Sequence, residues 1–207
     1  GYYQLRATPA GGATTQVPVA LVEADGTGLT PDSRFAVSLH MENAEYAGAA
    51  RAAASLGYAA ARNDLLWDRN ETSPGVYAWD AAYTTGFDEL RAQGIERLGL
   101  IVYGNPLYDE GKTVHTEGGL DAFASYALAA AERFDLEAVE VFNEFNHERF
   151  NTQSCGSAPS CYLPLLQATY NKVKTARPDT LVIAGSTALY DAPWFEGLWA
   201  IGGLDYA

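Results

Sequence analysis

The sequence predicts an α/β fold, a (β/α)₈ TIM barrel, because short apolar segments alternate with helical segments and polar residues follow the apolar ones. From residue 35 onward, five apolar segments are each followed by a helical one. Such alternation is typical of parallel strands joined by crossovers, in an open doubly wound sheet or a closed barrel. An open sheet predicts a glycine-rich phosphate loop after its first strand, whereas residues 40–46 read HMENAEY. The barrel is therefore favoured.

The elements follow one another in a regular order. The expected strands are 35–41, 58–67, 96–104, 138–146 and 180–188, and the expected helices are 45–57, 81–94, 119–134, 162–178 and 193–203. Gly57 and Gly94 are expected to end the first two helices, since glycine readily adopts the left-handed C-cap conformation. Thr116 is expected to cap the third helix, and Pro178 closes the fourth.

Polar and aromatic side chains gather where the expected strands end. These residues are His40, Glu42, Arg62, Asp64, Trp67, Tyr103, Asn105, Asn143, Glu144 and Ser186. In a barrel, the carboxyl ends of all strands meet at one face, where active sites form. The sequence therefore predicts a functional site at this face.

The barrel predicted from this chain is incomplete. A complete barrel needs about 250 residues, and residues 35–207 supply about five βα units and the start of a sixth strand. We expect the rest of the barrel, from the same protein or a second chain, to be a partner. Residues 1–34 contain β-type runs and turn dipeptides, which predict a separate β-type segment: a lead-in or part of a β-sandwich appendage. Residues 35–207 form the expected N-terminal portion of a catalytic barrel domain.

Composition excludes several classes of partner. The 207 residues carry 13 Lys and Arg against 26 Asp and Glu, a net charge of −13. Such a surface repels nucleic acid and anionic membranes, and no apolar run reaches the roughly 20 residues that span a bilayer. Only three histidines occur, with no ligand-spaced pair, which disfavours a metal-dependent hydrolase. We expect no metal and no cofactor.

The two cysteines lie close together in the sequence. Cys155 and Cys161 stand six positions apart in a loop rich in Ser, Gly and Pro. The alternatives are a disulfide, a metal site or two unpaired thiols, and two cysteines alone make a poor zinc site. The disulfide is favoured, and it indicates a secreted or periplasmic protein.

The fourth expected strand, AVEVFNEFN, carries the strongest chemical signal. Alternation along residues 138–146 predicts that Glu140, Phe142, Glu144 and Asn146 share one face. A half-buried Glu144 at the strand end is expected to have its pKa raised by desolvation, as a general acid requires. The neighbouring Asn143 can donate to a substrate hydroxyl. The alternative is a glutamate that caps the strand or pairs with an arginine.

VEVFNEFN resembles the acid/base strand of the clan A glycoside hydrolases, and three further segments support this resemblance. Residues 56–80, 98–111 and 192–207 are similar, in the expected order, to the second-strand, third-strand and pre-sixth-strand regions of these enzymes. The nearest match is to family 39-like enzymes. Phe142 and Phe145 depart from the usual Trp and Pro, but both keep apolar bulk.

The resemblance implies a retaining, endo-acting polysaccharide hydrolase with Glu144 as acid/base and the nucleophile on a seventh strand beyond this chain. The residues at or near the expected strand ends are the candidate substrate contacts: Asn143, Arg62, Trp67, Tyr103, Asn105, His40 and Trp194. The alternative for Arg62 is an internal ion pair with Glu140 or Asp64. The aromatic residues have the alternative of core packing, and the polar ones that of structural hydrogen bonding. A catalytically inactive carbohydrate-binding barrel is the alternative function.

Overall fold

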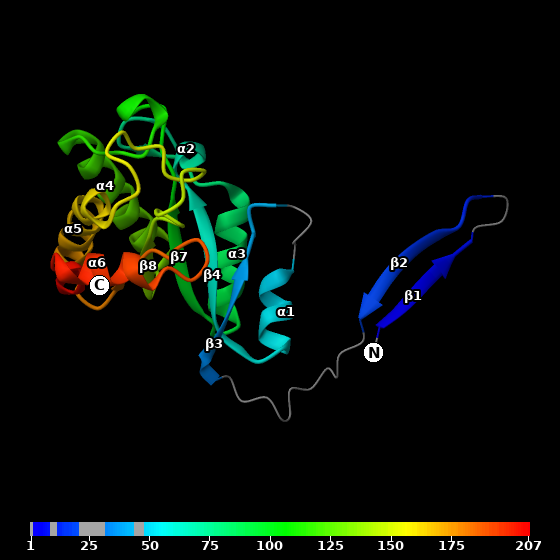
Figure 1. The fold of residues 1–207 in the computed structure, drawn as a ribbon. Coiled ribbons are helices and arrows are strands. Elements are labelled where there is room, and N and C mark those ends of the chain that lie inside the picture. The colour runs from blue at the N-terminus through cyan, green and yellow to red at the C-terminus, as the bar shows by residue number, and fades with distance from the viewer. Residues whose placement is uncertain (1, 9–11, 21–31, 44–47) are drawn as a thin grey trace.

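A parallel sheet forms the centre of the molecule. The computed structural model describes residues 2–8, 12–20, 32–43 and 48–207. Within them, five strands pair in parallel in the order β3-β4-β7-β8-β9 (Figure 1). Their bounds are β3 Asp32–Leu39, β4 Tyr58–Leu66, β7 Glu96–Val102, β8 Ala138–Val141 and β9 Leu181–Ala184. The spatial order equals the chain order, whereas a doubly wound sheet reverses direction at a switch point. The structure therefore confirms the α/β class and has the winding of a partial barrel.

Helices connect successive strands of the sheet. They are α1 Ala49–Ser55, α3 Ala81–Ala92, α4 Glu117–Phe134, α5 Pro159–Ala176 and α6 Ala192–Ala200. Between β4 and α3 lie the short helix α2 Trp67–Asn70 and a small hairpin, β5 Glu71–Ser73 with β6 Val76–Tyr77; η2 Asp109–Gly111 precedes α4. The Thr116 cap is confirmed, because its side chain accepts a hydrogen bond from the backbone N–H of Gly119 at 3.1 Å.

The two faces of the sheet differ in character. In β4, Ala61, Asn63 and Leu65 are buried, while Arg62 and Asp64 on the opposite face are only partly buried. The buried face packs against the helices in one continuous core, whose largest members include Trp67, Phe87, Phe123, Tyr126, Phe134 and Tyr162. The opposite face, which would line a barrel interior, carries the charged side chains.

The N-terminal segment forms a β-hairpin. Strand β1 Tyr2–Ala7 pairs antiparallel with β2 Thr15–Ala20, and residues 21–31 lie outside the described residues. Strand β3 begins at Asp32, so the expected boundary between residues 34 and 35 falls inside a strand. The division of the chain into two domains stays a prediction. Residues 45–47 of the first expected helix also lie outside the described residues.

Two expectations about strands were wrong. The expected start of a sixth strand is a 3₁₀ helix, η3 Gly203–Tyr206, whose Tyr206 ring packs edge-on against Tyr170 of α5 at 5.6 Å. The fourth and fifth strands end at Val141 and Ala184, earlier than expected. Phe142 causes the first of these differences, because its φ of 66° lies in the left-handed region and ends the extended backbone. No helix within the described residues combines the length and apolar character needed to cross a lipid bilayer.

Candidate active site

Seven side chains from neighbouring strand ends lie together, and we call them the strand-end cluster. They are Arg62, Asp64, Tyr103, Glu140, Asn143, Glu144 and Ser186. Strand β4 supplies the first two, and the others follow or end β7, β8 and β9. Because the strands are parallel and in register, their carboxyl ends carry these residues to one edge.

A two-pronged ion pair anchors the strand-end cluster. The Arg62 Nε and Nη2 atoms donate to the two Glu140 carboxylate oxygens at 2.6 and 3.1 Å. The Arg62 Nη1 atom lies 3.7 Å from an Asp64 oxygen. Burial lowers the pKa of Arg62, but the hydrogen bond and charge of Glu140 outweigh it and leave the pKa raised. The ion pair considered from the sequence is therefore present, and it holds the guanidinium in one orientation.

Asn143 is oriented by two donors. Its side-chain oxygen accepts from Arg62 Nη2 and from the Ser186 hydroxyl, each at 3.1 Å. With the oxygen engaged in this way, the amide nitrogen is left to donate, and it lies 3.4 Å from the Tyr103 hydroxyl. The arrangement presents a neutral donor at the end of β8, as binding to a substrate hydroxyl requires.

Glu144 is held by its backbone rather than by its side chain. Its backbone N–H donates to the Ser186 carbonyl at 2.8 Å, and its φ of 51° lies in the left-handed region. Strained backbone of this kind concentrates at functional sites. Gly185 allows the close approach, because a Cβ there would overlap the carbonyl oxygens of Val141 and Phe142. Within the described part of the chain, the carboxylate accepts no hydrogen bond, which leaves it available to a ligand.

Burial and the neighbouring members of the strand-end cluster together raise the pKa of Tyr103. Burial raises this pKa, the hydrogen bond with Asn143 lowers it, and the negative charges of Asp64 and Glu144 raise it further. Burial likewise raises the pKa of Asp64, opposed by the positive charge of Arg62. One Asp64 oxygen, Oδ1, is buried without a hydrogen-bond partner in the described structure.

His40 lies at the neighbouring strand end, beside Glu42. Its Nδ1 atom is 3.2 Å from a Glu42 oxygen, and half of its side chain is exposed. Asn63 fixes the loop after β3 by accepting from the Met41 backbone N–H at 2.8 Å. The charges of His40 and Glu42 both act on Asp64, so the structure brings His40 to the border of the strand-end cluster.

Three expected substrate contacts lie elsewhere, in the packed interior. Trp67 is 0% exposed and stacks on Tyr108 with ring centroids 5.1 Å apart. Asn105 is buried and donates to the carbonyl oxygens of Trp67 and Glu71 at 3.3 and 2.9 Å. Trp194 is buried at the start of α6, and its indole N–H donates to the Ser157 carbonyl at 2.7 Å. Neither tryptophan offers an open ring face to a sugar. Both pack in the core, which was the alternative considered from the sequence.

The predicted face alternation of the fourth strand holds only to Val141. Glu140 points to the interior face, where it meets Arg62. Phe142, after the end of the strand, is buried and does not share the face of Glu140. Its ring centroid lies 5.4 Å from that of Tyr103 and 5.3 Å from that of Phe145. Phe142 and Glu144 both have positive φ values, so the side chains after Val141 no longer alternate as they do in a strand.

The expected disulfide is confirmed, since Cys155 and Cys161 are bonded with Cα atoms 5.8 Å apart. It closes the loop that leads from β8 into α5. In the part of the chain that the structure describes, no group of three or more His, Cys, Asp or Glu side chains is arranged to hold a metal ion.

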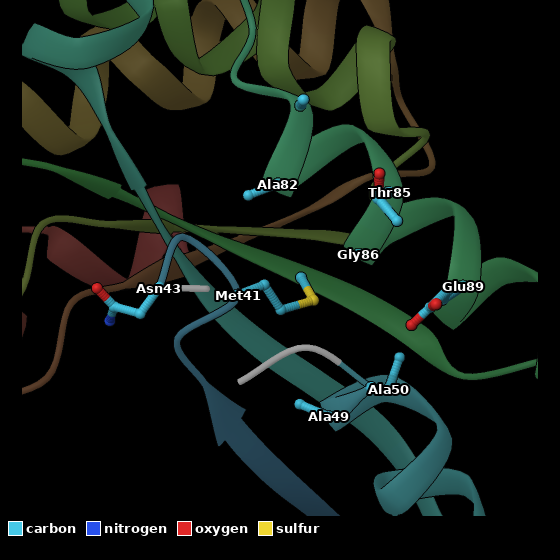
Figure 2. A pocket seen from close by; sticks show the side chains of 10 residues that line it. Met41, Asn43, Ala49, Ala50, Ala82, Thr85, Gly86 and Glu89 are labelled. Carbon is cyan, nitrogen blue, oxygen red and sulfur yellow. The ribbon is translucent and has the colours of Figure 1, made fainter. Parts of the chain in front are cut away.

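A separate pocket of about 280 Å³ lies between α1 and α3 (Figure 2). It is lined mainly by small residues and by Met41 and Glu89. No member of the strand-end cluster lines it.

Two features near the strand-end cluster were missed by sequence reasoning. Asn146 binds the loop after β9, with its side-chain oxygen accepting from the Ala188 N–H at 2.8 Å. Tyr190 in that loop is 93% exposed. A signal for the loop was present, because Asp191 followed by Pro193 is typical of a helix start. Nothing in the sequence indicated which side chains would be exposed.

The comparisons with known proteins place the chain among glycosidase folds. No family model matches the sequence, and no curated protein matches it. A family 39 glycoside hydrolase from the gut symbiont Bacteroides cellulosilyticus WH2 has a TM-score of 0.75 at 25% identity over 100% of this chain. The chain spans 44% of the length of that protein.

Two other solved structures share the fold at lower identity. The catalytic domain of GH30 xylanase C from Talaromyces cellulolyticus gives a TM-score of 0.55 at 16% identity, covering 72% of this chain and 42% of that one. The exo-β-1,4-mannosidase Op5Man5 from Opitutaceae bacterium strain TAV5 gives a TM-score of 0.57 at 15% identity. The match covers 79% of this chain and 34% of that one. The chain is therefore similar in structure to clan A glycoside hydrolases, family 39 among them, and has the fold of part of their barrel.

Proposed function

We propose that this chain supplies the acid/base half of the active site of a secreted retaining glycoside hydrolase that acts within a polysaccharide chain. The observation that carries the proposal is the Asn143–Glu144 pair at the end of β8. Asn143 is oriented by Arg62 and Ser186, and Glu144 has a carboxylate free of hydrogen bonds among the described residues. The structural similarity to glycoside hydrolases supports this assignment.

The chemistry needs two carboxyl groups. In a retaining glycosidase, one carboxylic acid protonates the leaving glycosidic oxygen while a second carboxylate, about 5–5.5 Å away, attacks the anomeric carbon. Glu144 would donate that proton and then, as the base, take a proton from the water that hydrolyses the glycosyl-enzyme intermediate. The nucleophile would come from the rest of the barrel, beyond this chain.

The other members of the strand-end cluster would position the substrate. Asn143 would donate to the sugar hydroxyl beside the cleaved bond, a hydrogen bond that strengthens as charge develops. Arg62, which Glu140 orients with hydrogen bonds of 2.6 and 3.1 Å, would hold the incoming nucleophile ionised. Tyr103 supplies a hydroxyl 3.4 Å from the Asn143 amide. Secretion is proposed because the disulfide between Cys155 and Cys161 requires an oxidising compartment to form and persist.

A Glu144→Gln variant of the full-length protein tests the proposal. Because general acid catalysis contributes roughly 10²–10⁴-fold, hydrolysis of an unactivated polysaccharide should fall by that factor while substrate affinity is kept. An aryl glycoside with a good leaving group needs less protonation and should lose less rate in the first step. Glu148→Gln, at an exposed position four residues later, is the matched control.

Two results would contradict the proposal. Near-normal polysaccharide turnover by Glu144→Gln would remove this residue from the mechanism. A wild-type protein that binds polysaccharide but never cleaves it would instead indicate a carbohydrate-binding barrel.

A further inference from the structure

The loop between β9 and α6 carries an unusual exposed pair. In this chain taken by itself, Leu189 and Tyr190 are 95% and 93% exposed, although both side chains are large and mainly apolar. They follow Ser186, whose hydroxyl and carbonyl bind Asn143 and the Glu144 backbone. The pair therefore lies only three and four residues along the chain from a member of the strand-end cluster.

A side-chain clamp fixes both ends of this tip. The Asn146 side chain accepts from the Ala188 N–H at 2.8 Å and donates to an Asp191 carboxylate oxygen at 2.9 Å. Asp191 also accepts from the Trp194 N–H at 3.2 Å as the cap of α6. Because the clamp holds residue 188 and residue 191, the two residues between them are displayed in a defined conformation.

The exposed conformation of this pair has an energetic cost. Leu189 has a φ of 59°, a left-handed conformation that is disfavoured for residues other than Gly, Asn and Asp. Exposing a tyrosine ring gives up the free energy of burying it. An exposed aromatic side chain on a backbone that is already held in place is typical of a contact surface, since little backbone ordering is needed when a ligand binds.

The position of the ring limits what it can touch. Tyr190 is four residues from Ser186, and four extended residues reach at most about 14 Å. The ring therefore lies within a few sugar units of the Asn143–Glu144 pair. A tyrosine offers an apolar face for the C–H groups of a sugar ring and a hydroxyl for its polar edge. The net charge of −13 opposes an anionic polysaccharide, so the fitting partner is an uncharged sugar unit.

We propose that Tyr190 is a stacking platform for a neutral sugar unit of the polysaccharide, at a subsite outside the cleaved bond, and that Asn146 positions it. This inference rests on the proposed function, because it assumes that the substrate lies along the strand-end cluster. The platform adds affinity for a long substrate and takes no part in bond cleavage.

The test compares substrates of different length on the full-length protein. Tyr190→Ala should raise KM for a neutral polysaccharide roughly tenfold, the effect of losing one aromatic stacking contact. Its kcat, and all constants for a short aryl glycoside, should stay at wild-type values. Tyr190→Phe should restore most of the affinity, because the ring is kept. Trp199→Ala, which removes a 49% exposed aromatic ring from α6, is the matched control and should change nothing.

Other outcomes separate the possible failures. Unchanged KM for polysaccharide in Tyr190→Ala overturns the platform while leaving Glu144 in place. Equal losses on long and short substrates also overturn it, since they indicate a structural contact with another part of the barrel. If the wild-type protein cleaves nothing, calorimetric binding of cello-, xylo- and manno-oligosaccharides of increasing length replaces kinetics. A Tyr190→Ala variant that binds them all as wild type does, or a wild-type protein that binds none, then refutes the platform.

Discussion

The Arg62–Glu140 ion pair should make a large and measurable contribution to stability. The two side chains are 24% and 8% exposed and share hydrogen bonds of 2.6 and 3.1 Å. Removing one partner of a buried pair typically costs about 3–5 kcal/mol, because the other charge is left uncompensated. Arg62 keeps Asp64 at 3.7 Å, and a glutamine can still accept one hydrogen bond. We therefore expect Glu140→Gln to lower the free energy of unfolding by about 2 kcal/mol.

A double-mutant cycle isolates the pair from other effects. The variants are Glu140→Gln, Arg62→Met and their combination, each measured by urea unfolding of the full-length protein. The combined variant has no unpaired charge at these positions, so it should be more stable than the sum of the two single losses predicts. The expected coupling energy is about 2 kcal/mol. It should persist at high salt concentration, since partly buried pairs are screened less than exposed ones.

A coupling energy below about 0.5 kcal/mol would refute the reasoning. Such a value would show that the pair is solvated in solution and that it does not hold Arg62 in one orientation. The orientation given to the Asn143 amide would then be wrong as well, because Arg62 is one of the two donors to its side-chain oxygen.

Three further predictions concern single sites. Asp64→Asn should stabilise the protein at neutral pH, because burial raises the pKa of Asp64 and disfavours its ionised form. Urea unfolding should show this gain shrinking to a minimum as pH falls below the pKa of an aspartate in the unfolded chain, where both states are protonated. Reducing the Cys155–Cys161 disulfide should lower the free energy of unfolding by about 2 kcal/mol, seen as a lower urea midpoint. Glu71→Gln should cost about 1–3 kcal/mol and increase hydrogen exchange in residues 103–116, because its buried carboxylate accepts from the Tyr108 hydroxyl at 2.7 Å.

Each of these has a control and a contrary result. Asp68→Asn, at an exposed position, should show no pH-dependent gain, and a gain for Asp64→Asn that is equal at every pH would contradict the role given to burial. Replacing both cysteines by serine should make the protein insensitive to reductant. Unchanged exchange in residues 103–116 of Glu71→Gln would show that this carboxylate does not hold the loop.

Local and periodic features of the fold could be predicted from the sequence, whereas contacts between distant segments could not. The helix that begins after Thr116 was expected because its cap uses residues a few positions apart. The interior location of Trp67 could not be predicted, because it depends on Tyr108 and Tyr126, which stack on it at 5.1 and 6.2 Å. An exposed and a buried aromatic residue have the same local sequence signal, so neither the burial of Trp67 nor the exposure of Tyr190 could be predicted.

The candidate site itself shows where periodicity stops being informative. Residues up to Val141 alternate as a strand should, and Glu140 accordingly faces Arg62. After that point, the left-handed residues Phe142 and Glu144 turn the backbone so that Asn143 reaches Arg62 and Ser186 together. A regular strand would have placed Asn143 on the face opposite to Glu140. The departure from regular structure is therefore what assembles the strand-end cluster, and only the residue types of Asn143 and Glu144, not their spacing, could signal it.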